Sequence, residues 1–484
     1  MSVALPAHGP GPIGSRTRRR RTAIDTDIAA GMRVVRRLTL HLFSFETLFV
    51  LFLFAGRFKA DPRFAWVPLD ITLLFFLASL AVGVTVVWRE RIYLPGLRLV
   101  MLFTAFVLWA CLTYAWTPGP LYGFAKLQML LSLSIWSLMG AALVIANRRI
   151  RVVRFLVLLT VFAILIAMDW LSFYGIGHFT ELGFIKSGGY LGAGVVFGAG
   201  AIVAFTVLIY APPLTLRWIA AGLVFALLAF TLFIIGGRSP IIALVVAMLL
   251  PMAVHVRFTR RGPMMHRSQV LVLLVILAAA GGIAWTVASG ELTWTLMRFG
   301  FLFSRGAEDS STAPRIAYFA FALDGWAKAP LFGHGLGSFG IMFLGFDFRT
   351  YPHNIFLEAM FENGTVGFLL LAACFVMAMR RLGIDRLRRE PVLLCSLMLL
   401  VSSLLFAVMS GAVAEERFLW TSLGLLLVRP FALTASHRPL TPMPARELPS
   451  SRTTPMPQGA QAAARRGAQA AAPPAVRPES LSTH

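Results

Sequence analysis

Charged residues are scarce in this chain of 484 residues. Only 13% of the residues are Asp, Glu, Lys or Arg, whereas 58% are hydrophobic. Soluble globular domains have about a quarter charged residues and about half apolar residues, so the composition excludes an ordinary soluble enzyme. Apolar runs of the length needed to cross a bilayer as an α-helix recur along the chain. We therefore expect an all-α, polytopic integral membrane protein.

Cysteine and the common nucleotide and metal motifs are also rare or missing. The three cysteines, Cys111, Cys374 and Cys395, lie in apolar runs and form no CxxC pair. Neither a disulfide framework nor a cysteine metal site is expected, and we interpret them as small buried hydrophobic residues. The sequence contains no Walker A motif and no HExxH motif, so it gives no support to nucleotide or metal chemistry. No cofactor and no metal are expected.

The apolar residues fall into twelve segments, which predict about twelve transmembrane helices. These segments are approximately 38–56, 67–88, 97–116, 121–146, 152–174, 190–210, 216–235, 239–256, 269–288, 353–380, 391–410 and 416–429. We expect three parts: a disordered basic arm over residues 1–37, a membrane domain over 38–429, and a disordered tail over 430–484. Low apolar content keeps the arm and the tail from forming a core.

Positive charge is in excess, with a formal net charge of +23, and it is distributed unevenly. Connections on the same side as the N-terminal arm are rich in Arg, whereas the opposite connections contain more Gly, Pro and aromatic residues. Cytoplasmic loops of membrane proteins are enriched in Lys and Arg. The pattern therefore predicts that both termini are cytoplasmic and that the opposite loops are external, which is periplasmic in a bacterium.

The largest external connection, about 289–352, precedes the tenth segment. It is too long for a simple connector, and long ordered loops usually have a function. Residues 315–328 predict a short helix lying on the membrane surface, with one apolar face formed by Ile316, Phe319, Leu323 and Trp326. The glycine-rich run 331–340 follows it. Glycine allows close approach of backbone to backbone or to a ligand, so this run is either a tight turn packed on helix ends or part of a site.

The tenth segment opens on polar residues. Pro352 suits the first turn of a helix, which places His353 at the mouth of that helix. Asn354, Glu358 and Glu362 follow at intervals of four residues on one helical face. Charge at membrane depth is costly unless it faces protein or water, so these residues indicate a site. His353 is either a general base for a sugar hydroxyl or a structural group at the helix end.

Some basic residues lie on the external side, against the general pattern. Arg238 occupies a turn between two apolar segments, Arg315 opens the short helix, and Arg417, Lys126 and Lys186 are expected near the same surface. A guanidinium group binds phosphate oxygens through two parallel hydrogen bonds. Arg238 and Arg315 therefore indicate a site for a lipid-anchored diphosphate. The alternative for each is a contact of its long side chain with lipid headgroups.

These residues together resemble the O-antigen ligase superfamily, which also includes O-antigen and exopolysaccharide polymerases. The family pattern Pro-His-Asn…Leu…Glu-x-Gly-x-x-Gly is similar to Pro352-His353-Asn354, Leu357-Glu358, Glu362-Asn363-Gly364 and Gly367. Its pattern Arg…Pro-hydrophobic-Gly-x-Gly-x-Gly-x-Phe is similar to Arg315 with Pro330, Gly333, Gly335, Gly337 and Phe339. Gly237-Arg238-Ser239 resembles the family's Ser-Arg-small motif, although Gly237 stands where the family often has Ser. The external loop is shorter than in typical lipopolysaccharide ligases.

The resemblance implies a metal-independent, inverting membrane glycosyltransferase whose donor is a polyprenyl-diphosphate-linked oligosaccharide. It implies that Arg238 and Arg315 hold the diphosphate and that His353 acts at the acceptor hydroxyl. From their position on the helix we expect Asn354 and Glu358 to contact substrate, and we add Arg417 and Lys186 because they lie near the same surface.

We therefore predict an enzyme that polymerises or transfers such saccharides at the periplasmic face of the bacterial inner membrane. Polymerase is favoured over ligase because the loop is compact. The acceptor is then a saccharide or a lipid-linked saccharide, and a chain-length regulator or export complex is a possible partner of the basic tails. The alternative is a flippase or transporter of the same lipid-linked saccharide, which would tolerate His353→Ala. A structural subunit of an export complex, in which neither Arg238 nor His353 matters, is the third hypothesis.

Overall fold

The structure, a computed structural model, describes residues 44–430 except 59–61, 65, 175–188, 260–261, 265–266, 290–295, 297–298, 301–303 and 305–311. The predicted arm over 1–37, the tail beyond Pro430 and the predicted substrate-binding residue Lys186 lie outside the described residues.

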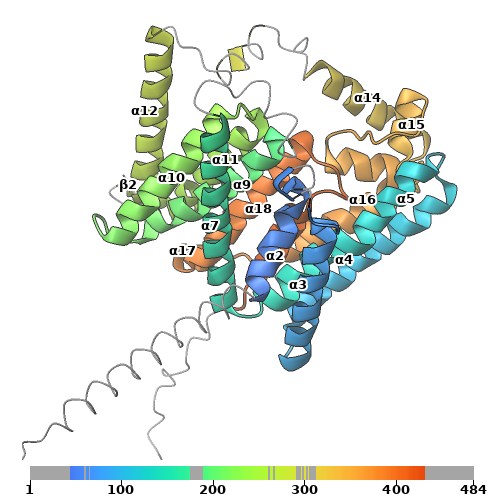
Figure 1. The fold of residues 1–484 in the computed structure, drawn as a ribbon, viewed down its shortest axis with the longest axis horizontal. Coiled ribbons are helices and arrows are strands. Elements are labelled where there is room, and N and C mark those ends of the chain that lie inside the picture. The colour runs from blue at the N-terminus through green and yellow to red at the C-terminus, as the bar shows by residue number, and fades with distance from the viewer. Residues whose placement is uncertain are drawn as a thin grey trace, which may run out of the picture. The chain divides into compact units, whose positions relative to one another are not determined.

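The described residues form a bundle of α-helices with short connections (Figure 1). The helices are α2 (Phe45–Phe54), α3 (Ile71–Arg89), α4 (Leu94–Thr113), α5 (Pro120–Met129), α6 (Ile135–Met139), α7 (Arg149–Tyr174), α9 (Tyr190–Tyr210), α10 (Leu216–Ile234), α11 (Arg238–His255), α12 (Arg267–Ala288), α14 (Ala313–Lys328), α15 (Ser338–Leu344), α16 (Ile355–Met379), α17 (Ile384–Arg389), α18 (Pro391–Ser410) and α19 (Arg417–Leu425). Two π-helical segments, Leu130–Ser134 and Gly140–Ile145, continue α5 and α6, so that 120–145 is one span. Two short strands, β1 (Arg257–Thr259) and β2 (Gly262–Met264), pair antiparallel with Arg257 opposite Met264.

Nine helices in the described part of the chain are long and apolar enough to cross a membrane, compared with twelve predicted from the sequence. The expected spans at 38–56 and 416–429 correspond to α2 and α19, which have 10 and 9 residues. A helix of ten residues is about 15 Å long, roughly half the hydrocarbon thickness of a bilayer. In the region expected at 269–288, the apolar stretch found among the described residues is Gln269–Ala278. The polytopic helical class is confirmed, but the count of twelve is not.

Helix α9 is the most deeply buried of these spans and packs against α7, α10, α11 and α18. Small residues permit this packing, because a Cβ atom at Gly194 would lie 2.6 Å from Cγ of Pro240, and one at Gly200 would lie 2.7 Å from Cβ of Ala163. Helices α11 and α18 also pack directly against each other. The N-terminal end of α11 and the C-terminal end of α18 are thereby held close together.

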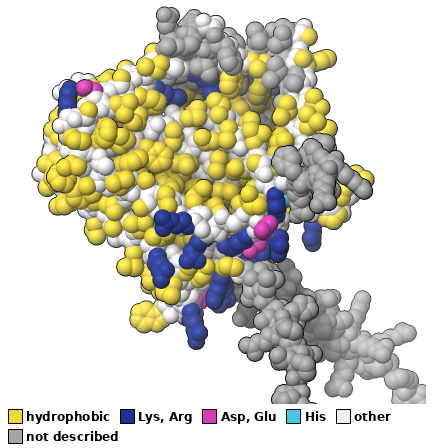
Figure 2. All heavy atoms as spheres, turned by 180° about the vertical axis from the view of Figure 1, so that it is seen from behind, with side chains coloured by type: hydrophobic (Ala, Val, Ile, Leu, Met, Phe, Trp, Pro, Cys, Tyr) yellow, Lys and Arg dark blue, Asp and Glu magenta, His cyan; other side chains and the backbone are white. Residues whose placement is uncertain are grey.

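Hydrophobic side chains cover most of the face drawn in Figure 2, and Lys and Arg side chains gather mainly along its lower margin. An apolar band with basic residues concentrated at one edge is what a membrane protein with an asymmetric charge distribution presents. The surface therefore agrees with an integral membrane protein.

The long connection that precedes α16 contains the predicted short helix. The sequence placed it at 315–328, and α14 spans Ala313–Lys328. Ile316 and Leu323 of the predicted apolar face are exposed, whereas Ala322 packs in a cluster with Phe339 and Phe361 and Gly325 packs against Phe361 of α16. Helix α14 thus packs on the bundle through one face and leaves part of the predicted apolar face at the surface.

Candidate functional site

A cavity of about 370 Å³ lies where α11, α14, α16 and α18 meet. Its polar lining includes Arg238, Ser239, Arg315 and Asn354, and its apolar lining includes Ile242, Ile316, Phe319, Val408 and Met409. The structure therefore brings three of the residues predicted from the sequence, Arg238, Arg315 and Asn354, to one cavity. Two guanidinium groups beside an apolar wall suit an anion that is attached to a hydrocarbon chain.

Each of these three side chains comes from the beginning of a helix. Arg238 is the first residue of α11, and Arg315 lies in the first turn of α14. Asn354 is the N-cap of α16 and accepts hydrogen bonds from the backbone N–H groups of Phe356 and Leu357 at 3.0 and 3.2 Å. Helix N-termini carry partial positive charge from unpaired backbone N–H groups. The electrostatics of the cavity therefore favour negative charge.

Ser410, the last residue of α18, links these elements. Its Oγ lies 3.0 Å from Oγ of Ser239 and accepts a hydrogen bond from Arg315 at 3.3 Å. Its carbonyl oxygen lies 3.4 Å from Nδ1 of His353. The last carbonyl groups of a helix lack intrahelical donors, and a carbonyl oxygen accepts only, so Nδ1 of His353 is the donor in this long contact. No sequence pattern indicates Ser410, because a serine in an apolar segment usually forms a hydrogen bond within its own helix.

His353 lies two residues before α16, next to this cavity. Its backbone adopts the left-handed region with φ 58°, which is rare for residues other than glycine and occurs often at functional sites. Its ring stacks on Tyr318 at 5.8 Å between centroids and meets Tyr351 edge to face at 4.6 Å. Burial lowers the pKa of His353, the Ser410 contact opposes this, and the nearby Arg315 lowers the pKa further. The ring is therefore neutral at neutral pH, and Nε2 carries the lone pair.

The sequence predicted a first helical turn at Pro352, with His353 at the mouth of the tenth membrane helix. The structure starts this helix at Ile355, because the Asn354 side chain caps it. The side-chain oxygen of a capping Asn accepts hydrogen bonds from the first backbone N–H groups of the helix, whereas a proline side chain has no acceptor atom. His353 consequently belongs to the turn before the helix and not to its first turn.

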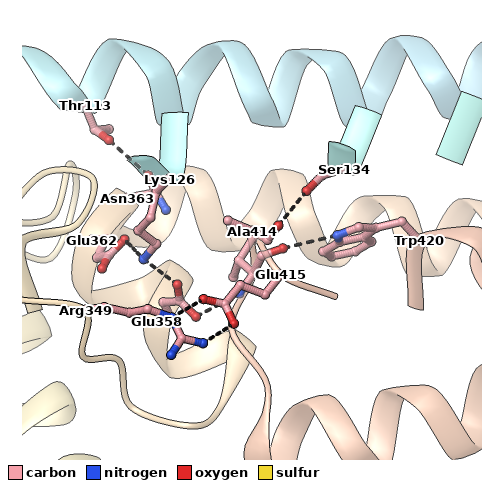
Figure 3. Close-up of polar contacts among 11 residues, drawn as sticks. Thr113, Lys126, Ser134, Arg349, Glu358, Glu362, Asn363, Ala414, Glu415 and Trp420 are labelled. Atoms are coloured by element: carbon pink, nitrogen blue, oxygen red, sulfur yellow. Dashed lines mark hydrogen bonds and ion pairs between the residues drawn. The ribbon is translucent and has the colours of Figure 1, made fainter. Parts of the chain in front are cut away.

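Glu358 and Glu362 do not line the cavity. Both face Lys126 of α5, and all three side chains are almost completely buried (Figure 3). The Lys126 ammonium forms ion pairs with both carboxylates, at 2.6 Å for Glu362. Glu358 also accepts a hydrogen bond from the backbone N–H of Val413 at 2.9 Å. Glu358, predicted to contact substrate, is thus placed inside an ion cluster that ties α5, α16 and the 411–416 segment together.

The glycine-rich run fills a break in α16. Gly364 has non-helical angles, φ 67° and ψ −170°, which leave carbonyl groups of the preceding turn without helical partners. The backbone N–H groups of His334 and Gly335 donate to the carbonyl groups of Phe361 and Glu362, both at 2.9 Å. A Cβ atom at Gly333 would lie 2.6 Å from the Glu362 backbone. Of the two interpretations of this run, the structure supports a turn packed on a helix.

Arg349 and Glu415 form a pair near His353 that the sequence did not indicate. Nε and one terminal nitrogen of Arg349 donate to the two carboxylate oxygens of Glu415, at 2.7 and 2.5 Å. The Arg349 guanidinium also lies 5.6 Å from the centroid of the Tyr351 ring. The two residues are 66 positions apart in the sequence, so no local pattern could reveal the pair.

Arg417, also predicted to contact substrate, points elsewhere. Its guanidinium donates to the carbonyl oxygen of Phe52 at 2.9 Å and lies over the Phe52 ring. It therefore joins α19 to α2 and does not line the cavity with Arg238 and Arg315.

The fold and the cavity define a polytopic membrane protein with a basic, partly apolar site at the ends of its helices. Residues 223–372 match the family model described as O-Antigen ligase, and this segment contains Arg238, Arg315 and His353. The match confirms the resemblance of this region to the O-antigen ligase and polymerase superfamily, and it supports an enzyme of the glycosyltransferase type. No curated protein matches the chain.

Proposed function

We propose that the protein is a membrane glycosyltransferase that polymerises or transfers polyprenyl-diphosphate-linked oligosaccharide at the periplasmic face of a bacterial inner membrane. The observation that carries this proposal is the convergence of Arg238 and Arg315 on one cavity with an apolar wall, next to His353. In this proposal both termini are cytoplasmic. Polymerase is favoured over ligase because the external connection is compact.

The proposed mechanism assigns different tasks to the two kinds of side chain. Nε2 of His353 takes the proton from the acceptor hydroxyl as its oxygen forms a bond to the anomeric carbon of the donor. The bond from that carbon to the diphosphate oxygen breaks, and the diphosphate leaves with the electron pair. Arg238 and Arg315 stabilise the negative charge that develops on it, and the apolar wall strengthens this effect by keeping water out. Attack opposite to the leaving group inverts the anomeric carbon.

The direct test uses protein purified in detergent and lipid-linked saccharide extracted from cells that lack the protein, without nucleotide. We expect wild type to make longer or transferred glycan and Arg238→Ala to make far less, because one of the two guanidinium groups for the diphosphate is gone. Electrophoresis of the released glycan measures the product, and its acceptor end distinguishes polymerase from ligase. If wild type instead only moves the lipid across the bilayer of reconstituted vesicles, the protein is a transporter and the proposal is wrong.

The pH dependence follows from the state of His353. The base must be neutral, so activity is expected to fall as the pH is lowered through the pKa of His353. Burial holds this pKa below its ordinary value of 6.5. The acid limb of kcat/KM should therefore have its midpoint below pH 6.5, and activity should rise to a plateau above that midpoint. Initial rates across this range in constant ionic strength measure it, and an acid limb centred above pH 7 would contradict the assignment.

A further inference from the structure

Tyr351, Arg349 and Glu415 form a polar and aromatic surface beside His353, which we call the Tyr351 surface. Tyr351 contacts the His353 ring, and Arg349 reaches over Tyr351 to pair with Glu415. The side chain of Arg349 is 57% exposed and that of Glu415 is 25% exposed. None of the three lines the cavity that contains Arg238 and Arg315. His353 therefore has a basic cavity and a separate polar surface as neighbours.

Several hydrogen bonds hold the backbone beneath this surface. Glu415 follows a short segment, 411–414, whose backbone is held by side chains from three helices (Figure 3). Val413 donates its N–H to Glu358 at 2.9 Å and accepts from the Trp420 indole at 3.1 Å, and the Ala414 carbonyl accepts from Ser134 at 3.1 Å. A binding group needs such fixation to keep its geometry. The buried ion cluster of Lys126 thus also helps to fix the position of Glu415.

A transferase of this kind must hold two substrates at once, with the acceptor hydroxyl next to the base and the leaving diphosphate on the opposite side of the anomeric carbon. Nδ1 of His353 faces the Ser410 carbonyl, so Nε2 is the atom left for the acceptor hydroxyl. The diphosphate of the donor needs the guanidinium groups of the cavity. An acceptor sugar presents several hydroxyl groups and apolar ring faces, which planar charged groups and aromatic side chains bind well. Burial also raises the pKa of Tyr351, so its hydroxyl stays protonated and can donate.

We propose that the Tyr351 surface binds the acceptor saccharide, with Glu415 and Arg349 hydrogen-bonded to hydroxyl groups of the sugar that carries the attacking oxygen. This inference rests on the proposed function. One of the residues assigned to the acceptor, Glu415, lies outside the segment matched by the family model. Acceptor specificity then depends on a part of the chain beyond that segment.

The test measures the KM for each substrate separately in Glu415→Gln. The donor is lipid-linked saccharide extracted from cells lacking the protein, and the acceptor is the same saccharide freed from lipid and labelled at its reducing end with a fluorophore. Loss of a charged hydrogen-bond partner is expected to raise the KM for the labelled acceptor about tenfold or more. The KM for the donor should stay at the wild-type value.

Asp169→Asn is the matched control. Asp169 pairs with Arg63 at 2.6 Å, and both side chains are partly exposed, so the substitution breaks a similar pair that includes neither His353 nor a residue lining the cavity. It should leave both KM values unchanged. The inference is overturned if Glu415→Gln changes neither KM, if it raises the KM for the donor, or if the two variants behave alike. If wild type forms no glycan from the donor with any acceptor, the proposed function fails first, which distinguishes the two failures.

Discussion

Replacing His353 by Ala is expected to reduce turnover by about 10²- to 10⁴-fold, the usual contribution of a general base. The donor should still bind, because Arg238 and Arg315 remain in the cavity. The loss should therefore be in kcat, with little change in the affinity for donor. Glycan formation under saturating substrate measures kcat, and binding of radiolabelled lipid-linked saccharide to the purified variant measures the donor affinity.

His255→Ala is the control for this prediction. Nδ1 of His255 also lies close to a backbone carbonyl group, that of Pro251 at 2.8 Å, but His255 does not line the cavity. Its replacement should leave turnover per folded molecule unchanged. Wild-type turnover in His353→Ala would exclude His353 as the base and would favour a structural role for the turn before α16.

Replacing Lys126 by Met is expected to have the largest effect on stability. Lys126 is the ion-pair partner of two buried carboxylates, and its loss leaves Glu358 and Glu362 facing each other without a cation. Breaking a buried pair by removing one partner costs about 3–5 kcal/mol. The variant should unfold at a clearly lower temperature in detergent, or be recovered from membranes in much smaller amounts. Thermal unfolding followed by intrinsic fluorescence and size-exclusion chromatography measures both.

A variant whose cluster carries no charge shows whether the loss of stability comes from unpaired charges or from lost packing. In the triple variant Lys126→Met, Glu358→Gln, Glu362→Gln, no charge remains in the cluster, and Gln at position 358 still has an oxygen that accepts from the Val413 N–H. Because neutral replacement of buried ion pairs is often tolerated, most of the stability should return. If Lys126→Met alone unfolds like wild type, the cluster does not hold these helices together.

Much of the fold is encoded locally. Apolar runs of about 20 residues predict membrane helices, because length and hydropathy decide whether a helix spans a bilayer. The periodicity of 315–328 predicts α14 to within two residues of its observed start. The same approach predicts spans at 38–56 and 416–429, where the described helices α2 and α19 have only 10 and 9 residues, so the count of twelve stays a prediction. Composition reports that a segment is buried, and it cannot report whether lipid or protein buries it.

The sequence by itself predicted the polytopic helical class, which the structure confirms, and the resemblance to the O-antigen ligase superfamily, which the family model confirms for residues 223–372. It also singled out Arg238, Arg315 and His353, whose roles stay predictions. The motifs that carry this resemblance are short and follow one another in a fixed order, so they can be recognised in the sequence alone. Only the tertiary structure decided which charges act together. Glu358 has the helical spacing of a site residue, yet Lys126, 232 positions earlier in the chain, pairs with it inside the protein. Arg417 binds a distant backbone carbonyl, and Ser410 joins His353 to Arg315. Such pairings depend on which helix faces pack together, and this packing is a property of the whole bundle that no local pattern contains.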